Sequence, residues 1–190
     1  PYGLIGITNN LNPMLESFQR LSKTEGGTKR AFQAMAAGLT GPAGVGIALA
    51  MRLQKKQSRV FVLTGDGEIN EGSNWEALMA AAKHKLTNLT VMVDYNKLQS
   101  YGRTVDVLDL EPLVDKFKSF GFVTHEVDGH DVAALEQIMK KLPFAKDAPS
   151  AIICHTIKGK GFPFAEGNPE WHHKSGMTET DIQQMYDCLI

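Results

Sequence analysis

Short apolar segments rich in β-branched residues alternate along this chain with stretches in which apolar residues recur at helical spacing. Four apolar segments have the length expected of buried strands: Arg59–Thr64, Leu89–Asp94, Phe122–Val127 and Ser150–His155. The helical stretches are Thr40–Lys56, Glu71–Lys83, Leu108–Phe120 and Val132–Leu142, and a capping pattern at Thr178 and Asp181 opens a final helix. This alternation predicts an α/β fold of three layers, in which helices cover both faces of a mostly parallel sheet.

Length and composition narrow the class of protein. The 190 residues fit a single domain with enough chain for a real core. The formal net charge is −1, so neither nucleic acid nor an acidic membrane is an expected partner. No apolar run is long enough to span a bilayer, and no signal-peptide pattern follows Pro1. The two cysteines, Cys154 and Cys188, lack metal-site spacing, so we expect a reduced, cytoplasmic protein.

Polar residues follow two of the predicted strands at the points where those strands end. Gly65-Asp66-Gly67 follows the first strand, and Asn96 comes just after the second. Because parallel strands end at the same edge of a sheet, Asp66 and Asn96 should converge there with nearby backbone carbonyls. Such an oxygen ligand set suits a hard divalent cation, and glycine lets the backbone approach a phosphate. The residues therefore predict a diphosphate bridged by Mg²⁺ or Ca²⁺.

The motif GDG, with an asparagine thirty positions after its aspartate, resembles the thiamine diphosphate fingerprint. The wider string GDGEINEGSNWEA, followed by VDYNKLQ, is similar to transketolases. The resemblance implies the diphosphate-domain fold of that family, with thiamine diphosphate as cofactor and Mg²⁺ or Ca²⁺ as metal. It implies that Asp66, Asn96 and the backbone carbonyl of Leu98 hold the metal, and that Gly65 and Gly67 contact the diphosphate.

Two further segments extend this resemblance. TGPAGVGIALAM is similar to the T-G-P-L-G-Q-G segment beside the cofactor's pyrimidine ring, where Gly41 would make a backbone contact; Ala43 and Val45 depart from the family pattern. Glu71 and Glu76 match glutamates of an acidic network that links the two cofactor sites across the transketolase subunit interface. Read from the residues alone, these two glutamates also suit the helix dipole or a solvated surface.

The C-terminal strand is followed by TIKGKG and then PEWHHK, which resemble the K-G-x-G and W-H-x-K segments of transketolases. Lys158 then matches a lysine near the reacting end of the cofactor, and His172 a histidine that contacts diphosphate and substrate oxygen. A lysine stabilises negative charge there, and a histidine moves protons near neutral pH. The alternative is that His172 and His173 are surface loop residues; His173 has no assigned role.

The resemblance covers residues 40–190, which we expect to form the diphosphate-binding domain. Residues 1–39 form an N-terminal segment that is incomplete relative to the family, because the upstream Ser-Lys-Gly-His motif with its active-site histidine is missing. The pyrimidine-binding domain of the family is also missing. The chain therefore resembles the N-terminal subunit of a split transketolase, with a C-terminal partner subunit that carries the pyrimidine domain, in an α2β2 heterotetramer.

Such an enzyme would transfer a two-carbon ketol unit from a ketose, or ketose phosphate, to an aldose or aldose phosphate. Two alternatives stay open. One is the α subunit of another thiamine diphosphate enzyme, such as a 2-oxo acid dehydrogenase, although the K-G-x-G and W-H-x-K segments favour a transketolase. The other is a non-catalytic subunit that keeps the fold, for which the missing histidine motif is the only support.

Overall fold

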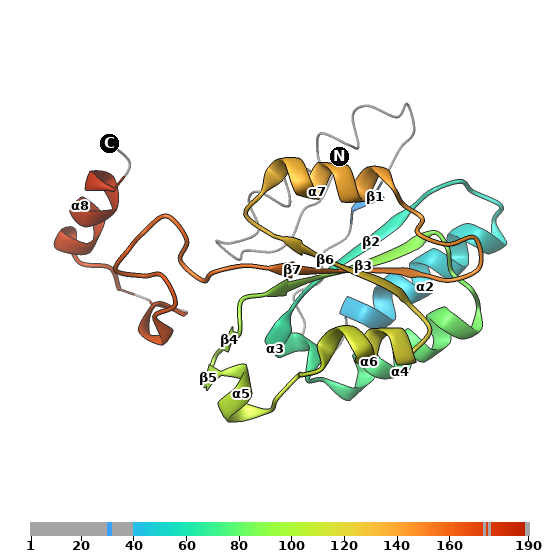
Figure 1. Ribbon diagram of the computed structural model, residues 1–190, viewed down its shortest axis with the longest axis horizontal. Coiled ribbons are helices and arrows are strands. Elements are labelled where there is room, and N and C mark those ends of the chain that lie inside the picture. The colour runs from blue at the N-terminus through green and yellow to red at the C-terminus, as the bar shows by residue number, and fades with distance from the viewer. Residues whose placement is uncertain (1–29, 32–39, 173, 175, 189–190) are drawn as a thin grey trace.

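The computed structural model describes residues 30–31, 40–172, 174 and 176–188. A five-stranded sheet with the order β1-β2-β3-β7-β6 lies at its centre (Figure 1). Its strands are β1 (Arg30–Ala31), β2 (Val60–Gly65), β3 (Leu89–Tyr95), β6 (Val123–Asp128) and β7 (Ser150–His155). Every neighbouring pair is parallel. The carboxyl ends of the strands therefore lie along one edge of the sheet, as the sequence predicts.

Helices cover both faces of this sheet, so the expected three-layer α/β fold is confirmed (Figure 1). One face carries α2 (Thr40–Leu53), α4 (Gly72–Lys83) and α6 (Leu113–Ser119), and the other carries α7 (Val132–Lys140). Strand residues alternate between the two layers: Val91 and Val93 pack into the first core, and Met92 packs into the second. Because both faces are covered, β3 is buried along its whole length, which explains its continuous apolar sequence.

Several boundaries differ from the sequence prediction. A short helix, α3 (Asp66–Ile69), begins directly at Asp66, and α4 starts at Gly72 with Glu71 as its N-cap. The helix expected from Leu108 begins only at Leu113, because Pro112 disfavours helical geometry in the residue before it. Between β3 and that helix lie a small antiparallel hairpin, β4 (Leu98–Gln99) and β5 (Gly102–Arg103), and α5 (Thr104–Val107), none of which was expected.

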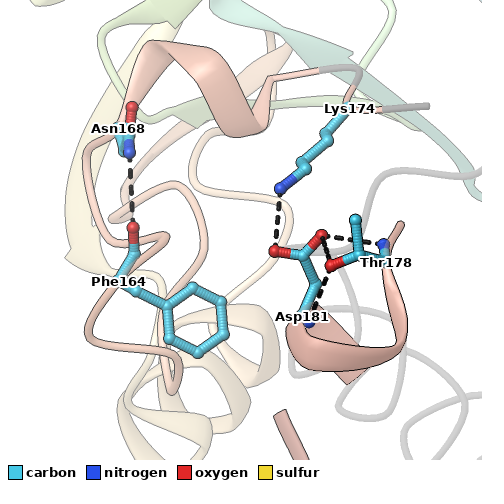
Figure 2. Close-up of polar contacts among 5 residues, drawn as sticks. All are labelled: Phe164, Asn168, Lys174, Thr178 and Asp181. Carbon is cyan, nitrogen blue, oxygen red and sulfur yellow. Dashed lines mark hydrogen bonds and ion pairs between the residues drawn. The ribbon is translucent and has the colours of Figure 1, made fainter. Parts of the chain in front are cut away.

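The chain after β7 leaves the carboxyl edge of the sheet and carries η1 (Pro169–Trp171) and α8 (Glu179–Asp187) away from the main body (Figure 1). Local contacts hold this segment together. Asp181 accepts the Thr178 amide at 2.9 Å, and its own amide donates to the Thr178 hydroxyl at 3.1 Å, which confirms the capping box (Figure 2). Lys174 Nζ donates to Asp181 at 3.0 Å. Lys174 Nζ also lies 3.8 Å from the ring centroid of Trp171. The remainder of segment 1–39, apart from β1, lies outside the described residues.

Candidate functional site

Asp66 joins the ends of two neighbouring strands. Its side chain is only 2% exposed. One carboxylate oxygen accepts the Gly67 amide at 2.7 Å, and the other accepts the Lys97 amide at 2.5 Å. Lys97 adopts a φ of 64°, a left-handed conformation that is uncommon for a residue with a side chain and is often found at functional sites. The contact brings the chain after β3 against the aspartate that follows β2, as predicted from the parallel sheet.

Asn96 is held in a fixed orientation beside this contact. Its Oδ1 accepts the Leu98 amide at 3.0 Å, and its side chain also hydrogen-bonds to the carboxylate of Asp94. Since Asp94 accepts, the amide nitrogen of Asn96 is the donor, which leaves Oδ1 facing the turn. Asp94 is itself 2% exposed and accepts a hydrogen bond from the Thr156 hydroxyl, which links the ends of β3 and β7. Sequence reasoning missed both Asp94 and Thr156.

Burial governs the charge of the two aspartates. It raises the pKa of Asp66 to about 7, an effect that the backbone hydrogen bonds from Lys97 and Gly67 partly offset. Burial also raises the pKa of Asp94, with the Thr156 hydrogen bond opposing it. The nearby charge of Lys158 lowers both pKa values. Two buried carboxylates lie near only one lysine, so their negative charge would exceed the nearby positive charge if both were ionised. A bound cation would stabilise the ionised carboxylates.

The donor set at this edge fits a hard divalent cation. It combines the Asp66 carboxylate, the Asn96 amide oxygen and the Leu98 carbonyl, and oxygen ligands of this kind suit Mg²⁺ and Ca²⁺. Within the described residues, no group of three His, Cys, Asp or Glu side chains is arranged to hold a metal. A Cβ atom on Gly67 would lie 2.8 Å from Cβ of Gln99, so only glycine fits at this turn.

A cleft of about 510 Å³ opens beside these groups. Its walls come from the ends of β3 and β7, the β4–β5 hairpin and the loop after β7. The lining residues are Tyr95, Asn96, Lys97, Leu98, Arg103, His155, Thr156, Ile157, Lys158, Gly167 and Pro169. Three of them are cationic, and no carboxylate side chain of the described residues lines the cleft. The cleft therefore suits a ligand that carries several negative charges.

Gly41 is fixed at the start of α2 by a network that reaches α3. Its amide donates to Asn74 Oδ1 at 3.0 Å, and Asn74 Nδ2 donates to the Glu68 carbonyl at 2.7 Å. A Cβ atom on Gly41 would lie 2.4 Å from Asn74 Oδ1, so the close approach requires glycine. The Glu68 carboxylate hydrogen-bonds to Thr40 and to the Gly65 backbone, while burial raises its pKa. Asn74 and Glu68 were not predicted, although both follow the GDG motif closely.

The structure brings Asp66, Asn96, Leu98 and Lys158 together, but three predicted residues lie elsewhere. Glu71 and Glu76 are exposed on α4. His172 follows η1 and is half-buried. None of these three side chains is among the residues that line the cleft, and neither is the buried Asp66, which contacts the cleft wall through its hydrogen bond with the Lys97 amide. Their roles at an interface or at the diphosphate stay predictions.

Comparison with known proteins places this chain in a family. Residues 3–189 match the family described as transketolase, thiamine diphosphate binding domain. The chain is 45% identical over 134 residues to an apulose-4-phosphate transketolase subunit of Actinobacillus succinogenes, covering 70% of this chain and 48% of that protein. It is 39% identical over 131 residues to a 6-deoxy-6-sulfo-D-fructose transketolase subunit of a Clostridium species, covering 69% and 48%.

Solved structures agree with this assignment. A transketolase variant of Pichia stipitis in complex with fructose 6-phosphate superposes with a TM-score of 0.70 at 29% identity, covering 78% of this chain and 23% of that chain. The chain belongs to the transketolase family and forms its thiamine diphosphate binding domain, so the predicted family is confirmed. It spans about half the length of the curated relatives that it matches. Among the described helices, none combines the length and apolar character needed to cross a membrane.

Proposed function

We propose that the chain is the thiamine diphosphate-binding subunit of a two-subunit transketolase, which transfers a two-carbon ketol unit from a ketose to an aldose. The observation that carries this proposal is the hydrogen bond between the Lys97 amide and Asp66, because it brings Asp66, Asn96 and Leu98 to one place beside Lys158. The names of relatives support it, since two of them are named as subunits of apulose-4-phosphate transketolases.

Each group at the edge has a distinct role in this proposal. Asp66, Asn96 and the Leu98 carbonyl would hold Mg²⁺ or Ca²⁺, which would neutralise negative charge on the diphosphate. Gly65 and Gly67 let the backbone approach the phosphate oxygens, and Gly41 contacts the pyrimidine ring from the start of α2. When bound, the cofactor supplies the electron sink that cleavage beside a carbonyl requires.

Two residues of the loop after β7 act near the substrate. Lys158 neutralises charge on the diphosphate, and its effect on the pKa of Asp66 and Asp94 indicates that it faces this region. His172 moves protons on the substrate oxygen. Because His172 does not line the cleft in the isolated chain, its action requires the assembled enzyme or movement of its loop.

The substrates are sugars or sugar phosphates. Two relatives are named for sugars that carry a phosphate or a sulfonate, which are both tetrahedral oxyanions. In this chain Lys97 and Arg103 line the cleft. Lys97 Nζ lies 5.3 Å from the ring centroid of Tyr95, and its charge helps to lower the pKa of Glu111. The positive charge of Lys97 and Arg103 would bind the phosphate or sulfonate group of a substrate, in addition to the cofactor diphosphate that Lys158 and the metal would neutralise.

The partner is a C-terminal transketolase subunit that carries the pyrimidine domain, in an α2β2 heterotetramer. The relatives support a partner, because they are named as subunits. Glu71 and Glu76 are exposed, as residues of a subunit interface must be before assembly. The described cysteines, buried Cys154 and exposed Cys188, are both free thiols, which is compatible with a reduced, cytoplasmic setting.

The test combines the purified chain with the subunit encoded beside it, thiamine diphosphate and Mg²⁺. A ketose phosphate donor and an aldose acceptor are added, and the two-carbon-longer product is followed by chromatography. We expect ketol transfer, and a lower KM for a phosphorylated donor than for the same sugar without phosphate. Decarboxylation of a 2-oxo acid without ketol transfer would identify the alternative thiamine enzyme, and neither reaction would identify a non-catalytic subunit.

A further inference from the structure

The turn between β6 and α7 reads Gly129-His130-Asp131, and no role in the proposed function has been assigned to it. We infer that His130 is a positioning residue, which fixes the start of the loop after β7 and thereby the place of Lys158 at the diphosphate site. The inference rests on the proposed function, because that function assigns Lys158 to the diphosphate.

The imidazole of His130 acts as a hydrogen-bond acceptor. The amide of Ile157 donates to His130 Nε2 at 2.8 Å. A ring nitrogen accepts only when it carries no proton, so the neutral ring with its proton on Nδ1 makes this contact. Ile157 directly precedes Lys158, so the hydrogen bond sets the direction in which the chain leaves β7. Lys158 is close enough to lower the pKa of Asp66 and Asp94.

Hydrogen bonds fix the backbone around His130. Its own amide donates to Asp128 Oδ1 at 2.8 Å, and Asp131 Oδ1 accepts the Ala134 amide at 3.0 Å as the N-cap of α7. The backbone on either side of the imidazole is therefore fixed by side-chain oxygens. Because this backbone is fixed, the His130 imidazole is held in one position, and it in turn fixes the Ile157 amide.

Gly129 brings this turn against the end of β7. Its amide donates to the His155 carbonyl at 2.8 Å. A Cβ atom at this position would lie 2.4 Å from Cγ2 of Thr156, so glycine is required for the approach. Thr156 in turn donates from its amide to the Tyr95 carbonyl at 3.2 Å and from its hydroxyl to Asp94. His155 and Thr156 are thus held by hydrogen bonds, and the hydrogen bond between His130 and Ile157 holds the next residue, directly before Lys158.

Beyond Ile157 the loop closes on itself. The Gly167 amide donates to the Lys158 carbonyl at 2.8 Å, and the Phe162 amide donates to the Gly159 carbonyl at 3.0 Å. Gly159 has a φ of 77°, and a Cβ there would lie 2.5 Å from the Ala165 carbonyl oxygen. Figure 1 shows the chain moving away from the sheet after β7. Because the loop is held together by its own hydrogen bonds, its position depends on where its first residues are fixed. His130 fixes the loop at Ile157.

Three substitutions separate this role from a general structural one. In His130→Gln, the amide oxygen can reach the place of Nε2, so the hydrogen bond is restored. In His130→Asn, the shorter side chain places its oxygen near the position of Nδ1, too far from Ile157. His130→Ala removes the acceptor. We expect His130→Asn and His130→Ala to raise the dissociation constant of thiamine diphosphate with Mg²⁺ by about tenfold, and His130→Gln by less than about threefold.

The measurements use the full chain for binding and the reconstituted complex for turnover. Hydrogen exchange at the Ile157 amide, followed by NMR, should speed up about tenfold or more in the Asn and Ala variants and remain slow in the Gln variant. In the complex, kcat should fall more than the KM of the donor rises, because Lys158 acts at the diphosphate. His84→Ala is the matched control, since His84 is an exposed histidine at the C-cap of α4.

The outcomes separate the inference from the proposed function. Failure of the wild-type reconstituted complex to bind the cofactor would count against the proposed function, while exchange at Ile157 would still test the anchor. Unchanged exchange and binding in His130→Asn would overturn the inference. Equal losses in the Asn and Gln variants would also overturn it, because accepting the Ile157 amide would then not matter. If His130→Ala fails to fold, the comparison of Asn with Gln remains decisive.

Discussion

Asp66 shows how burial and function oppose each other at a single residue. The folded chain raises its pKa from the usual 3.8 to about 7, mainly by desolvation. A raised folded-state pKa means that its contribution to stability is complete below about pH 4 and is lost as the pH rises through about 7. Near neutral pH the ionised aspartate is therefore a cost to the cofactor-free protein. A divalent cation that binds the carboxylate would offset this cost.

This pKa gives a prediction for Asp66→Asn. Wild-type protein without cofactor should lose on the order of 1 kcal/mol or more of unfolding free energy between pH 5 and pH 8 through this residue. The variant should lack that part of the pH dependence and should also fail to bind thiamine diphosphate through Mg²⁺. Urea unfolding at several pH values measures the first effect, and cofactor titration measures the second. An identical pH profile in both proteins would contradict the raised pKa.

His172 gives a second prediction at this scale. If it assists proton movement on the substrate, His172→Ala should lower kcat of the reconstituted complex by about a hundredfold. The dissociation constant of thiamine diphosphate should change much less, because the metal and the glycine backbone hold the diphosphate. His84→Ala again serves as the control and should leave both values unchanged. A fall in cofactor affinity as large as the fall in kcat would assign His172 to cofactor binding instead.

The predictable residues of the site are those whose roles follow from strand ends. Asp66 and Asn96 could be placed together because both follow parallel strands. Asp94 also lies at a strand end, but its partner Thr156 is 62 positions away on the chain and was not predicted. Asn74 and His130 could not be placed from strand ends, because each acts through a backbone amide on another element. Asn74 bonds to an amide 33 positions away, and His130 to one 27 positions away. No spacing rule links such pairs.

At the scale of elements, α2 packs against the sheet through glycine. A Cβ on Gly44 would lie 2.0 Å from Cγ2 of Val62 in β2, whereas a Cβ on Gly46 would have no atom within 4 Å. We expect Gly44→Ala to destabilise the fold by about 1–3 kcal/mol through overpacking. Gly46→Ala should stabilise it by up to about 1 kcal/mol, because alanine favours the helix. Thermal unfolding of both variants checks the pair, and equal effects would contradict this packing of α2.

Helices and strands were predictable where the pattern of apolar residues was long and where the adjacent segments of the chain also had a clear pattern. The four long strands β2, β3, β6 and β7 and the helices α4 and α7 were predicted with shifts of a few residues at their ends, whereas the two-residue strand β1 was not predicted. The β4–β5 hairpin was missed because each of its strands has two residues, too few for any periodicity. The hairpin nevertheless carries Leu98 and Arg103, which line the cleft. The short elements that define a site are thus the ones that a periodic pattern does not reveal.

At the scale of the molecule, the described chain forms the cleft at the carboxyl edge of its sheet, and a subunit that carries the pyrimidine domain would hold the other end of the cofactor. With thiamine diphosphate, Mg²⁺ and both sugars present, the chain alone should bind the cofactor weakly and show no ketol transfer above background. Activity should appear when the partner subunit is added, because only then are both ends of the cofactor held in a reactive geometry.

Titration with the partner makes this prediction quantitative. At a fixed concentration of this chain, activity should rise with added partner and reach a plateau at an equimolar ratio, as an α2β2 assembly requires. Light scattering on the same mixtures should show the heterotetramer at the plateau. Asp66→Asn, mixed in the same way, separates assembly from catalysis: it should form the complex if the Lys97 contact is kept, yet remain inactive. Turnover by the chain alone at a rate that the partner leaves unchanged would show that the chain needs no partner subunit to hold the cofactor.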